Sequence, residues 1–318
     1  MTRGGPVVHV ASAHAKINLG LAITGVRPDG YHELASVFLR LALADTLAVT
    51  IAGPGRPDAL TVDDPACPVE DNLVLKALRA LRTAIGDPDR AELPGLLVSL
   101  GKRIPMGGGL AGGSTDAAAI LRLAPVAWGL APVAGDLLPL AARLGADVPF
   151  FVGGHAAALV TGIGEELAPL PPLRSRAGVL LVTPPFGMAT PAVFRAYDRL
   201  GPGTDGAATA VTDLVEAWGG GLDGPGLAGH ASRLRDANDL WAAAAGLDER
   251  LPALRDALET RLDRPVLLTG SGSTLVALYP SPEAARDAAR DIAADPALAG
   301  ARVTATADEP PPDEDPTA

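Results

Sequence analysis

The sequence contains little cysteine, few aromatic side chains and no long uninterrupted hydrophobic run. Cys67 is the single cysteine among 318 residues, so an intrachain disulfide and a cysteine metal cluster are both excluded. A secreted chain of this size would more often carry several cysteines, so a reducing compartment fits better. No segment reaches the roughly 18 apolar residues of a membrane helix, because prolines at 125 and 132 interrupt the most apolar stretch, residues 123–135.

Basic residues are also in the minority. The net charge of −11 argues against a nucleic-acid partner, because phosphate backbones select basic surfaces. Near the N-terminus, His9, Ser12, His14 and Lys16 break up the apolar segment that a secretory signal requires. We therefore expect a cytoplasmic protein that binds neither nucleic acid nor membrane. Its length suits one large or two ordinary globular domains.

The hydrophobic pattern predicts an α+β protein, with strands in groups and helices between them. Strands are predicted at residues 7–10, 15–23, 34–42, 45–51, 96–103, 179–183, 266–268, 275–278 and 302–305, and helices at 71–85, 117–123, 137–144, 232–245, 252–262 and 282–293. Pro125 is expected to kink or end the helix that starts near Ala117. Residues 201–229, rich in glycine, are expected to hold mobile loops, and the acidic run from Asp308 a disordered tail.

The most unusual stretch joins the strand at 96–103 to the helix at 117–123. It reads Pro105-Met106-Gly107-Gly108-Gly109-Leu110-Ala111-Gly112-Gly113-Ser114-Thr115-Asp116. Glycine permits close backbone approach and positive φ, and a helix N-terminus offers unsatisfied N–H groups with a partial positive charge. Ser114 and Thr115 can cap the helix or donate to phosphate oxygens. The segment is predicted to cradle polyphosphate; the alternative is a linker or a tight turn. It matches neither the P-loop nor the dinucleotide-binding pattern.

Three separated segments resemble the motifs of the GHMP small-molecule kinases. They are Ala13-His14-Ala15-Lys16-Ile17-Asn18-Leu19, the glycine-rich stretch just quoted, and Leu268-Thr269-Gly270-Ser271-Gly272-Ser273-Thr274. Further segments resemble the diphosphocytidyl-methylerythritol kinases within that superfamily: Arg27-Pro28-Asp29-Gly30-Tyr31-His32-Glu33-Leu34, Gly145-Ala146-Asp147-Val148-Pro149-Phe150-Phe151, Thr161-Gly162-Ile163-Gly164-Glu165, Thr190-Pro191-Ala192-Val193-Phe194 and Asn238-Asp239-Leu240. The likeness extends over nearly the whole chain, from about Val10 to Tyr279.

The resemblance implies a two-domain α+β fold. The N-terminal domain is expected to be of the ribosomal S5 domain 2-like type and the C-terminal domain ferredoxin-like, with the active site in the cleft between them. We place the N-terminal domain at residues 1–168, the C-terminal domain at 169–306 and the tail at 307–318. The assembly is expected to be a monomer or a weak homodimer.

The resemblance also implies a reaction. The γ-phosphate of ATP is expected to pass to the 2-hydroxyl of 4-diphosphocytidyl-2-C-methyl-D-erythritol, a small molecule linked to cytidine diphosphate, giving the 2-phosphate and ADP in non-mevalonate isoprenoid biosynthesis. ATP and Mg²⁺ are the expected cofactors, with Pro105 through Thr115 binding ATP. No residue is assigned as a metal ligand.

Lys16 and Asp147 are the catalytic residues that the resemblance implies. Lys16 and Asn18 lie two apart on a predicted strand, so their side chains point to the same face. Asp147 is expected to accept the proton of the attacking hydroxyl or only to orient that hydroxyl, because phosphoryl transfer demands little activation of the nucleophile. The alternatives are a solvated Lys16 and an Asp147 that caps a helix or turn.

Asn18, Tyr31, His32, Phe38, Thr190 and Phe194 are the implied substrate contacts. Flat rings stack on a base, and a histidine beside them can hydrogen-bond its edge. The alternatives are core packing for Phe38 and Phe194 and a backbone-bonded turn for His32.

The roles of several flanking residues stay open. Asp116 can serve the helix dipole without touching a ligand. Lys102 and Arg103 can supply charge near ATP, although lysines at strand ends are usually solvated. The segment from Gly270 to Thr274 is expected to lie near the glycine-rich loop, or to be a plain hairpin turn. Rival functions are another GHMP kinase, acting on homoserine, a sugar or mevalonate, and a catalytically idle protein of the same fold.

Overall fold

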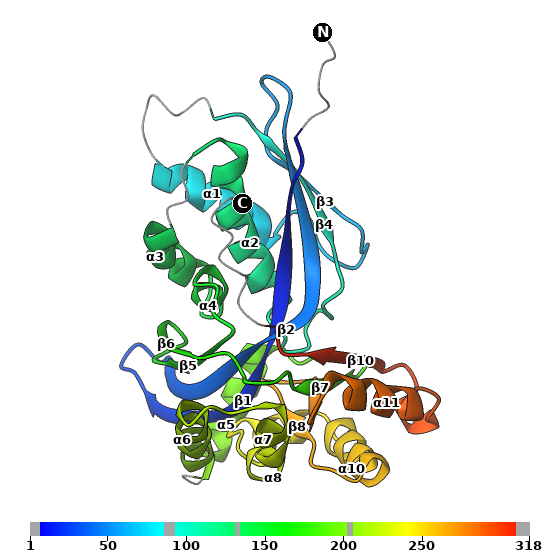
Figure 1. Ribbon diagram of the computed structural model, residues 1–318. Coiled ribbons are helices and arrows are strands. Elements are labelled where there is room, and N and C mark those ends of the chain that lie inside the picture. The colour runs from blue at the N-terminus through cyan, green and yellow to red at the C-terminus, as the bar shows by residue number, and fades with distance from the viewer. Residues whose placement is uncertain (1–6, 86–92, 131–133, 202–205, 310–318) are drawn as a thin grey trace. The chain divides into compact units, whose positions relative to one another are not determined.

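A computed structural model describes residues 7–85, 93–130, 134–201 and 206–309 of the protein. It divides into two compact units, each assembled from separate stretches of the chain (Figure 1). Unit 1 consists of Met1–Ala15, Leu43–Ile104 and Ala111–Gly154, and unit 2 of Lys16–Ala42, Pro105–Leu110 and His155–Ala318. The chain passes between the units several times, so this division differs from the expected boundaries at residues 168 and 306. The two-domain scheme stays a prediction.

Two long strands, β1 and β2, contribute to both units. Their bounds are His9–Val26 for β1 and His32–Ile51 for β2. The sequence predicted a break in each, at residues 11–14 and at 43–44, and both predictions are wrong. Strand β2 runs without interruption through Leu43 and Ala44 into Asp45. The structure buries this carboxylate completely and supplies it with partners from elsewhere in unit 1.

Unit 1 combines strands with helices, and α1 and α2 lie together on one side of its strands (Figure 1). The remaining elements of this unit are β3 (Ala59–Val62), α1 (Leu73–Ile85), β4 (Leu96–Gly101), α2 (Gly112–Ala127), α3 (Ala134–Leu144) and α4 (Val148–Val152). Strand β4 pairs antiparallel with β2, from Thr46↔Gly101 to Ile51↔Leu96, and parallel with β3. Helix α1 begins directly after Asn72, whose side chain caps it by accepting from the backbone N–H of Val74 at 3.0 Å.

Helix α2 differs from its prediction at both ends. It starts at Gly112, five residues before the predicted start, and it continues through Pro125 to Ala127. A proline so close to the end costs little, because it removes a single N–H donor from the last turn. The following hydrogen bond, from the N–H of Trp128 to the carbonyl of Ala124, is kept at 3.0 Å.

Unit 2 contains a four-stranded antiparallel sheet of order β10-β7-β9-β8. The bounds are β7 (Gly178–Thr183), β8 (Leu267–Leu268), β9 (Leu275–Tyr279) and β10 (Arg302–Ala307). Along the chain, helices follow β7, then β8 and β9, then helix α11 (Pro282–Ile292) and finally β10. This is the βαββαβ arrangement of ferredoxin-like folds, so the predicted C-terminal fold is confirmed.

The other described elements of unit 2 are helices and two strands, β5 and β6, that continue the sheet of β2. They are β5 (Ala157–Thr161), β6 (Glu166–Leu170), α5 (Thr190–Leu200), α6 (Gly206–Gly219), α7 (Gly224–Gly229), α8 (Ala231–Leu234), α9 (Trp241–Leu247), α10 (Arg250–Leu262) and the 3₁₀ helix Pro296–Leu298. Strand β2 pairs antiparallel with β5, from Ser36↔Val160 to Leu39↔Ala157, and β5 pairs antiparallel with β6.

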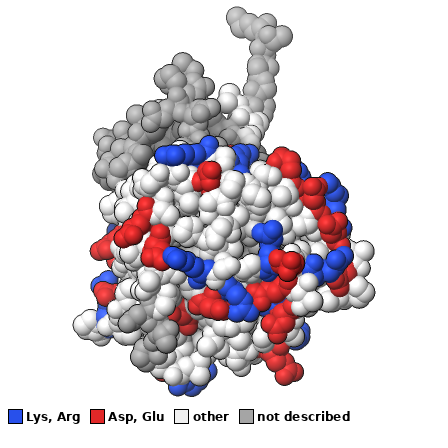
Figure 2. Space-filling model, turned by 60° about the horizontal axis from the view of Figure 1, so that its bottom comes forward, with Lys and Arg blue, Asp and Glu red and all other residues white. Residues whose placement is uncertain are grey.

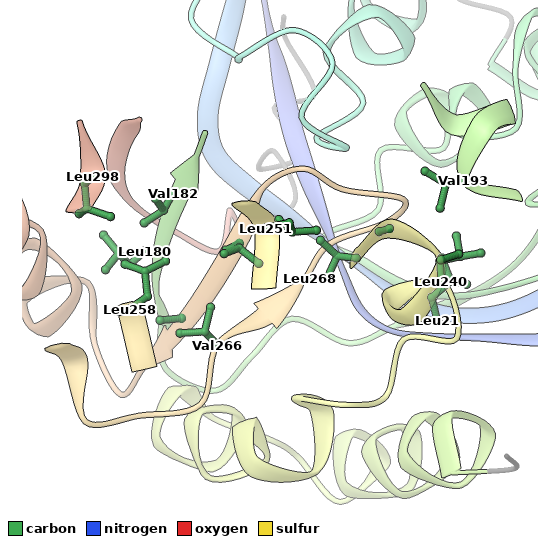
Figure 3. Close-up of a cluster of buried hydrophobic side chains, with 14 of the residues drawn as sticks. Leu21, Leu180, Val182, Val193, Leu240, Leu251, Leu258, Val266, Leu268 and Leu298 are labelled. Atoms are coloured by element: carbon green, nitrogen blue, oxygen red, sulfur yellow. The ribbon is translucent and has the colours of Figure 1, made fainter. Parts of the chain in front are cut away.

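The core of unit 2 forms where the sheet meets its helices (Figure 3). Leu180 and Val182 of β7 pack with Leu258 of α10, and every residue of β7 is buried. Leu21 of β1 joins the same cluster. Each such side chain contributes about 1.5–3 kcal/mol of transfer free energy to folding. The buried side chains therefore stabilise the sheet and fix the positions at which its loops begin and end.

Three further predictions for unit 2 are corrected. Residues 206–219 and 224–229, expected to be mobile loops, form α6 and α7, because Ala207, Val211, Leu214 and Trp218 make an apolar helical face that is buried. Residues 232–245 are two short helices, α8 and α9, and not one helix. Residues 307–309 were assigned to the tail, but Asp308 Oδ1 accepts from the N–H of Ala177 at 2.7 Å. The rest of the predicted tail lies outside the described residues.

Charged side chains of both signs lie beside one another on the face that Figure 2 shows. In unit 2, such pairs include Arg233 with Asp213 at 2.6 Å and Arg235 with Glu259 at 2.6 Å. The charge on this face is therefore mixed, unlike the basic surface that nucleic acids select. In the part of the chain that the structure describes, no helix has the length and apolar character needed to span a bilayer.

Candidate active site

Strand β1 carries a buried lysine and asparagine side by side. Lys16 Nζ donates to Asn18 Oδ1 at 2.7 Å, and each residue is only 3% exposed. The ammonium group also lies 4.4 Å from the ring centroid of Phe38. The two side chains thus share one strand face, as predicted, and the solvated alternative for Lys16 is wrong. Because little water reaches this ammonium group, its charge is weakly screened.

Asn18 links β1 to two segments that the sequence did not pair with it. Its Nδ2 donates to Ser36 Oγ at 2.9 Å, and Ser36 Oγ donates in turn to the carbonyl of Gly20 at 2.6 Å. Its backbone N–H donates to Thr269 Oγ1 at 2.8 Å. Ser36 could have been found from its place two residues before Phe38, on the same strand face. Thr269 belongs to the third motif, but no pattern signals its hydrogen bond to Asn18, which is 251 residues away.

The glycine-rich segment Pro105–Leu110 lies against the third of the three kinase motifs, residues Leu268–Thr274, called the third motif below. A Cβ on Gly108 would stand 2.6 Å from Thr274 Oγ1, and one on Gly109 would stand 2.8 Å from the carbonyl oxygen of Thr269. The N–H of Thr274 donates to the carbonyl of Gly108 at 3.4 Å. Glycine is therefore required here for close packing of two backbones. The predicted proximity of these two motifs is confirmed.

Replacing Gly109 by alanine should impair ATP use. The residue has φ +78°, and the added methyl group would collide with the Thr269 carbonyl, so the segment must shift. We expect KM for ATP to rise by about 10-fold or more, as for a misplaced binding loop, measured by steady-state ADP release. Gly129→Ala is the matched control, because Gly129 has φ +69° but no neighbour within 4 Å of its Cβ. An equal effect in both variants would assign the loss to backbone strain alone.

Hydrogen bonds from Asn238 and Thr190 support the third motif. Asn238 Nδ2 donates to the carbonyls of Leu268 and Gly270, at 3.1 and 2.9 Å. The Oγ atoms of Thr190 and Ser271 lie 2.8 Å apart, which brings one predicted substrate residue to this motif. Asn238 belonged to a segment of the resemblance, but its supporting role has no sequence signal.

The predicted cytosine contacts are only partly brought together. The ring of His32 stacks on Phe194 at a centroid distance of 5.0 Å and a tilt of 37°. His32 Nε2 lies 2.7 Å from Asp198 Oδ1, so a carboxylate orients the imidazole, and this partner was not predicted. Phe38 is buried and its ring faces the ammonium group of Lys16. Tyr31, in contrast, is 62% exposed.

In unit 1, the start of α2 completes the glycine-rich sequence. Ala111 occupies the N-cap position with φ 58° and ψ 31°, and Gly112 through Thr115 form the first helical turn. The N–H of Thr115 donates to the carbonyl of Ala111 at 3.0 Å, and the N–H groups of Gly112, Gly113 and Ser114 are the ones that a helix leaves for capping groups or ligands. The sequence thus combines a loop, Pro105–Leu110, with a helix N-terminus.

Lys102 is buried, and the expectation of a solvated lysine is wrong. Its Nζ donates to Asp116 Oδ2 at 2.8 Å and to Asp45 Oδ2, and its side chain is 4% exposed. Burial raises the pKa of Asp116 to about 7, with Asp45 adding to the rise and Lys102 opposing it. Burial by itself would lower the pKa of Lys102, but Asp116 and Asp45 raise it. Asp45 was not among the predicted residues.

Asp147 stands immediately before helix α4. It has φ −82° and ψ −16°, and its side chain makes no capping hydrogen bond to that helix. The residue is half-buried, whereas Val148 and every later residue of α4 are buried. The alternative that the Asp147 side chain caps helix α4 is therefore not supported by a capping hydrogen bond.

The folds of the units and the glycine-rich segment define a kinase of the GHMP class. The family model described as GHMP kinases N terminal domain matches residues 72–155. The fold is also that of a homoserine kinase from Cytophaga hutchinsonii, with a TM-score of 0.65 and 18% identity over 97% of this chain and 96% of the other.

Relatives of higher identity narrow this class. A 4-diphosphocytidyl-2-C-methyl-D-erythritol kinase of Gluconacetobacter diazotrophicus is 39% identical over 294 residues, which cover 87% of this chain and 88% of the relative. The crystal structure of a 4-(cytidine 5'-diphospho)-2C-methyl-D-erythritol kinase matches with a TM-score of 0.71 and 33% identity, over 94% of this chain and 98% of that one. The chain belongs to the 4-diphosphocytidyl-2-C-methyl-D-erythritol kinase family.

Proposed function

We propose that this protein transfers the γ-phosphate of ATP to the 2-hydroxyl of 4-diphosphocytidyl-2-C-methyl-D-erythritol. The products are the 2-phosphate and ADP, in the non-mevalonate route to isopentenyl diphosphate. The observation that carries this proposal is the 39% identity, over 87% of the chain, to a relative of that name. We place the reaction in the cytoplasm, where ATP is abundant and a chain with one cysteine stays reduced. We propose a monomer or a weak homodimer.

ATP is the phosphate donor of GHMP kinases, and we propose that Pro105–Leu110 and the first turn of α2 bind it. Two features support this. Gly107 and Gly109, with φ +68° and +78°, hold backbone conformations that other residues rarely adopt, so the backbone of this segment can approach a ligand closely. The first turn of α2 presents backbone N–H groups and the positive end of a helix dipole.

Mg²⁺ is proposed to arrive with ATP. Over the described ranges, no group of three or more His, Cys, Asp or Glu side chains is placed to hold a metal ion. We propose an ion held by phosphate oxygens and water, with the Ser114 hydroxyl as a protein ligand. When bound, the ion neutralises charge on the β- and γ-phosphate oxygens.

Lys16 and Asp147 are proposed to act on the reacting groups. The buried ammonium of Lys16, held in place by Asn18, is suited to stabilise negative charge in the transition state. Asp147 is proposed to hold the acceptor hydroxyl and to take its proton.

The cytidine end is proposed to bind at His32 and Phe194. Removing the Phe194 ring in Phe194→Ala should raise KM for the cytidylated substrate by about 5–150-fold, because one aromatic ring stacked on a base contributes about 1–3 kcal/mol. KM for ATP, measured in the same assay, should not change. Asp198→Asn should raise KM in the same direction, because His32 loses the carboxylate that orients it. A parallel rise in both KM values would contradict a base-stacking role for Phe194.

The function itself is tested by ADP release from Mg-ATP. The acceptors are 4-diphosphocytidyl-2-C-methyl-D-erythritol, the same alcohol without cytidine, and homoserine. Turnover with the first acceptor alone is expected. Turnover with homoserine alone would keep the kinase fold and overturn the proposed substrate, and absence of turnover with all three would favour an idle protein of the same fold.

A further inference from the structure

Asn238 lies between two parts of the candidate site in unit 2. Its Nδ2 donates to the carbonyls of Leu268 and Gly270, the two neighbours of Thr269 in the third motif. Its Oδ1 accepts from the backbone N–H of Leu240 at 3.0 Å. The residue is 5% exposed, so little water competes for these hydrogen bonds. One amide group therefore holds the backbone on both sides of Thr269.

The residues on either side of Asn238 bind to strand β1. The backbone N–H of Leu21 donates to the carbonyl of Ala237 at 2.8 Å, and the N–H of Asp239 donates to the carbonyl of Leu21 at 2.9 Å. The carboxylate of Asp239 also accepts from the N–H of Ile23 at 2.8 Å. Asn238 thus reaches the third motif from a segment that is itself paired with β1.

A buried arginine of α10 contacts both ends of the segment 236–241. Arg255 Nη2 donates to the carboxylate of Asp236, and the guanidinium carbon lies 4.0 Å from the ring centroid of Trp241. One buried cluster also holds an apolar side chain from β1, from this segment and from the third motif: Leu21, Leu240 and Leu268 (Figure 3). The support of Asn238 is therefore part of the core of unit 2.

The third motif in turn contacts Asn18. Thr269 Oγ1 accepts from the backbone N–H of Asn18, and a Cβ on Gly270 would stand 3.3 Å from Asn18 Oδ1. This Oδ1 atom is the one that accepts from Lys16 Nζ at 2.7 Å. A shift of Thr269 or Gly270 would therefore move the oxygen that holds the Lys16 ammonium group.

We propose that Asn238 is a positioning residue, which places the Lys16 ammonium group by way of the third motif and Asn18. The inference rests on the proposed function, in which Lys16 stabilises charge in the transition state. A preorganised donor acts only from the correct position, and a misplacement of about 1 Å can cost about 10²-fold in rate. Because Asn238 acts through Lys16, its effect on kcat should depend on the presence of that lysine.

The test is a double-mutant cycle in kcat, measured at saturating concentrations of both substrates. Asn238→Ala removes both donated hydrogen bonds and should lower kcat by about 10–100-fold. In the Lys16→Met background, the same substitution should lower kcat by less than about threefold, because the ammonium group that it misplaces is already absent. A purely structural role would lower kcat by the same factor in both backgrounds.

Saturating ATP separates this effect from one on the glycine-rich segment. The third motif also contacts Gly108 and Gly109, so Asn238→Ala can raise KM for ATP as well. That rise should persist in the Lys16→Met background, whereas the loss of kcat should not. The two parameters therefore report on the two neighbours of the third motif independently.

Thr269→Val repeats the cycle at the next contact and keeps the test available if Asn238→Ala fails to fold. Valine has nearly the shape of threonine but cannot accept from the N–H of Asn18, so its loss of kcat should also depend on Lys16. Asp223→Ala is the control in unit 2, because Asp223 Oδ1 caps α7 by accepting from the N–H of Gly226 at 2.8 Å. This variant should lower thermal stability and leave kcat unchanged.

Equal factors in the two backgrounds would overturn the inference and leave the proposed function intact. An unchanged kcat in a folded Asn238→Ala variant would overturn it as well. Absence of turnover by the unmodified protein would contradict the proposed function itself, and the role of Asn238 would fall with it.

Discussion

Asp147→Asn is expected to lower kcat by about 10²–10⁴-fold, the range for loss of a general base. Asparagine is nearly the same size and can still accept a hydrogen bond from the acceptor hydroxyl, but it cannot take the proton. Because the side chain of Asp147 makes no capping hydrogen bond to α4, the substitution should leave the helix intact. The variant therefore separates proton transfer from alignment of the hydroxyl.

The measurement is steady-state kcat and KM for both substrates, with thermal unfolding as the check on folding. KM for ATP should stay within about threefold, as for an interaction made mainly in the transition state. Asp71→Asn is the matched control in unit 1, since the Asp71 side chain is 91% exposed. A kcat within a factor of about 10 of the unmodified protein would show that Asp147 only orients the hydroxyl.

Lys16→Met is expected to lower kcat by about 10²–10³-fold, comparable to removing one preorganised donor from a site that stabilises charge. Methionine keeps most of the apolar stem against Phe38, so the core of this strand pair should survive. The loss is electrostatic, because the buried ammonium group is poorly screened. Asn18 Oδ1 also loses its donor, which should cost about 1–3 kcal/mol of stability.

The three lysines of the chain provide controls for this prediction. Lys76, with a side chain 47% exposed, should tolerate methionine with kcat unchanged. Lys102→Met leaves the buried carboxylates of Asp45 and Asp116 without their cation and should lower the stability of unit 1. If Lys16→Met kept full kcat while Lys102→Met lost it, the assignment of the catalytic lysine would be wrong.

Local patterns in the sequence predicted much of the fold and the outline of the site. The alternation at Lys16 and Asn18 placed both side chains on one strand face, and the glycine-rich segment marked the helix N-terminus. The βαββαβ order of unit 2 followed from the resemblance, since strand pairing across long distances leaves no local signal.

Several of the errors have one physical cause, which is a partner remote in sequence. Asp45 was placed at the start of a separate strand, whereas it lies inside β2, where an isolated carboxylate would be costly to bury. Lys102, 57 residues later, and two backbone N–H groups remove that cost. Asp198, 166 residues from His32, was missed for the same reason. Helix α6 was predicted as loop because the glycines at its ends were given more weight than the apolar face formed by Val211 and Leu214.

The hydrogen bond from Asn18 to Thr269 has a consequence for how the enzyme is made. Its two residues are 251 positions apart, so a ribosome working at about 5–20 residues per second needs roughly 10–50 s to deliver the second after the first. Throughout that interval, the buried amide of Asn18 has no third motif to bind. The kinase therefore cannot acquire activity progressively during synthesis, and a chain that stops short of Thr269 lacks a working site even if its glycine-rich segment is complete.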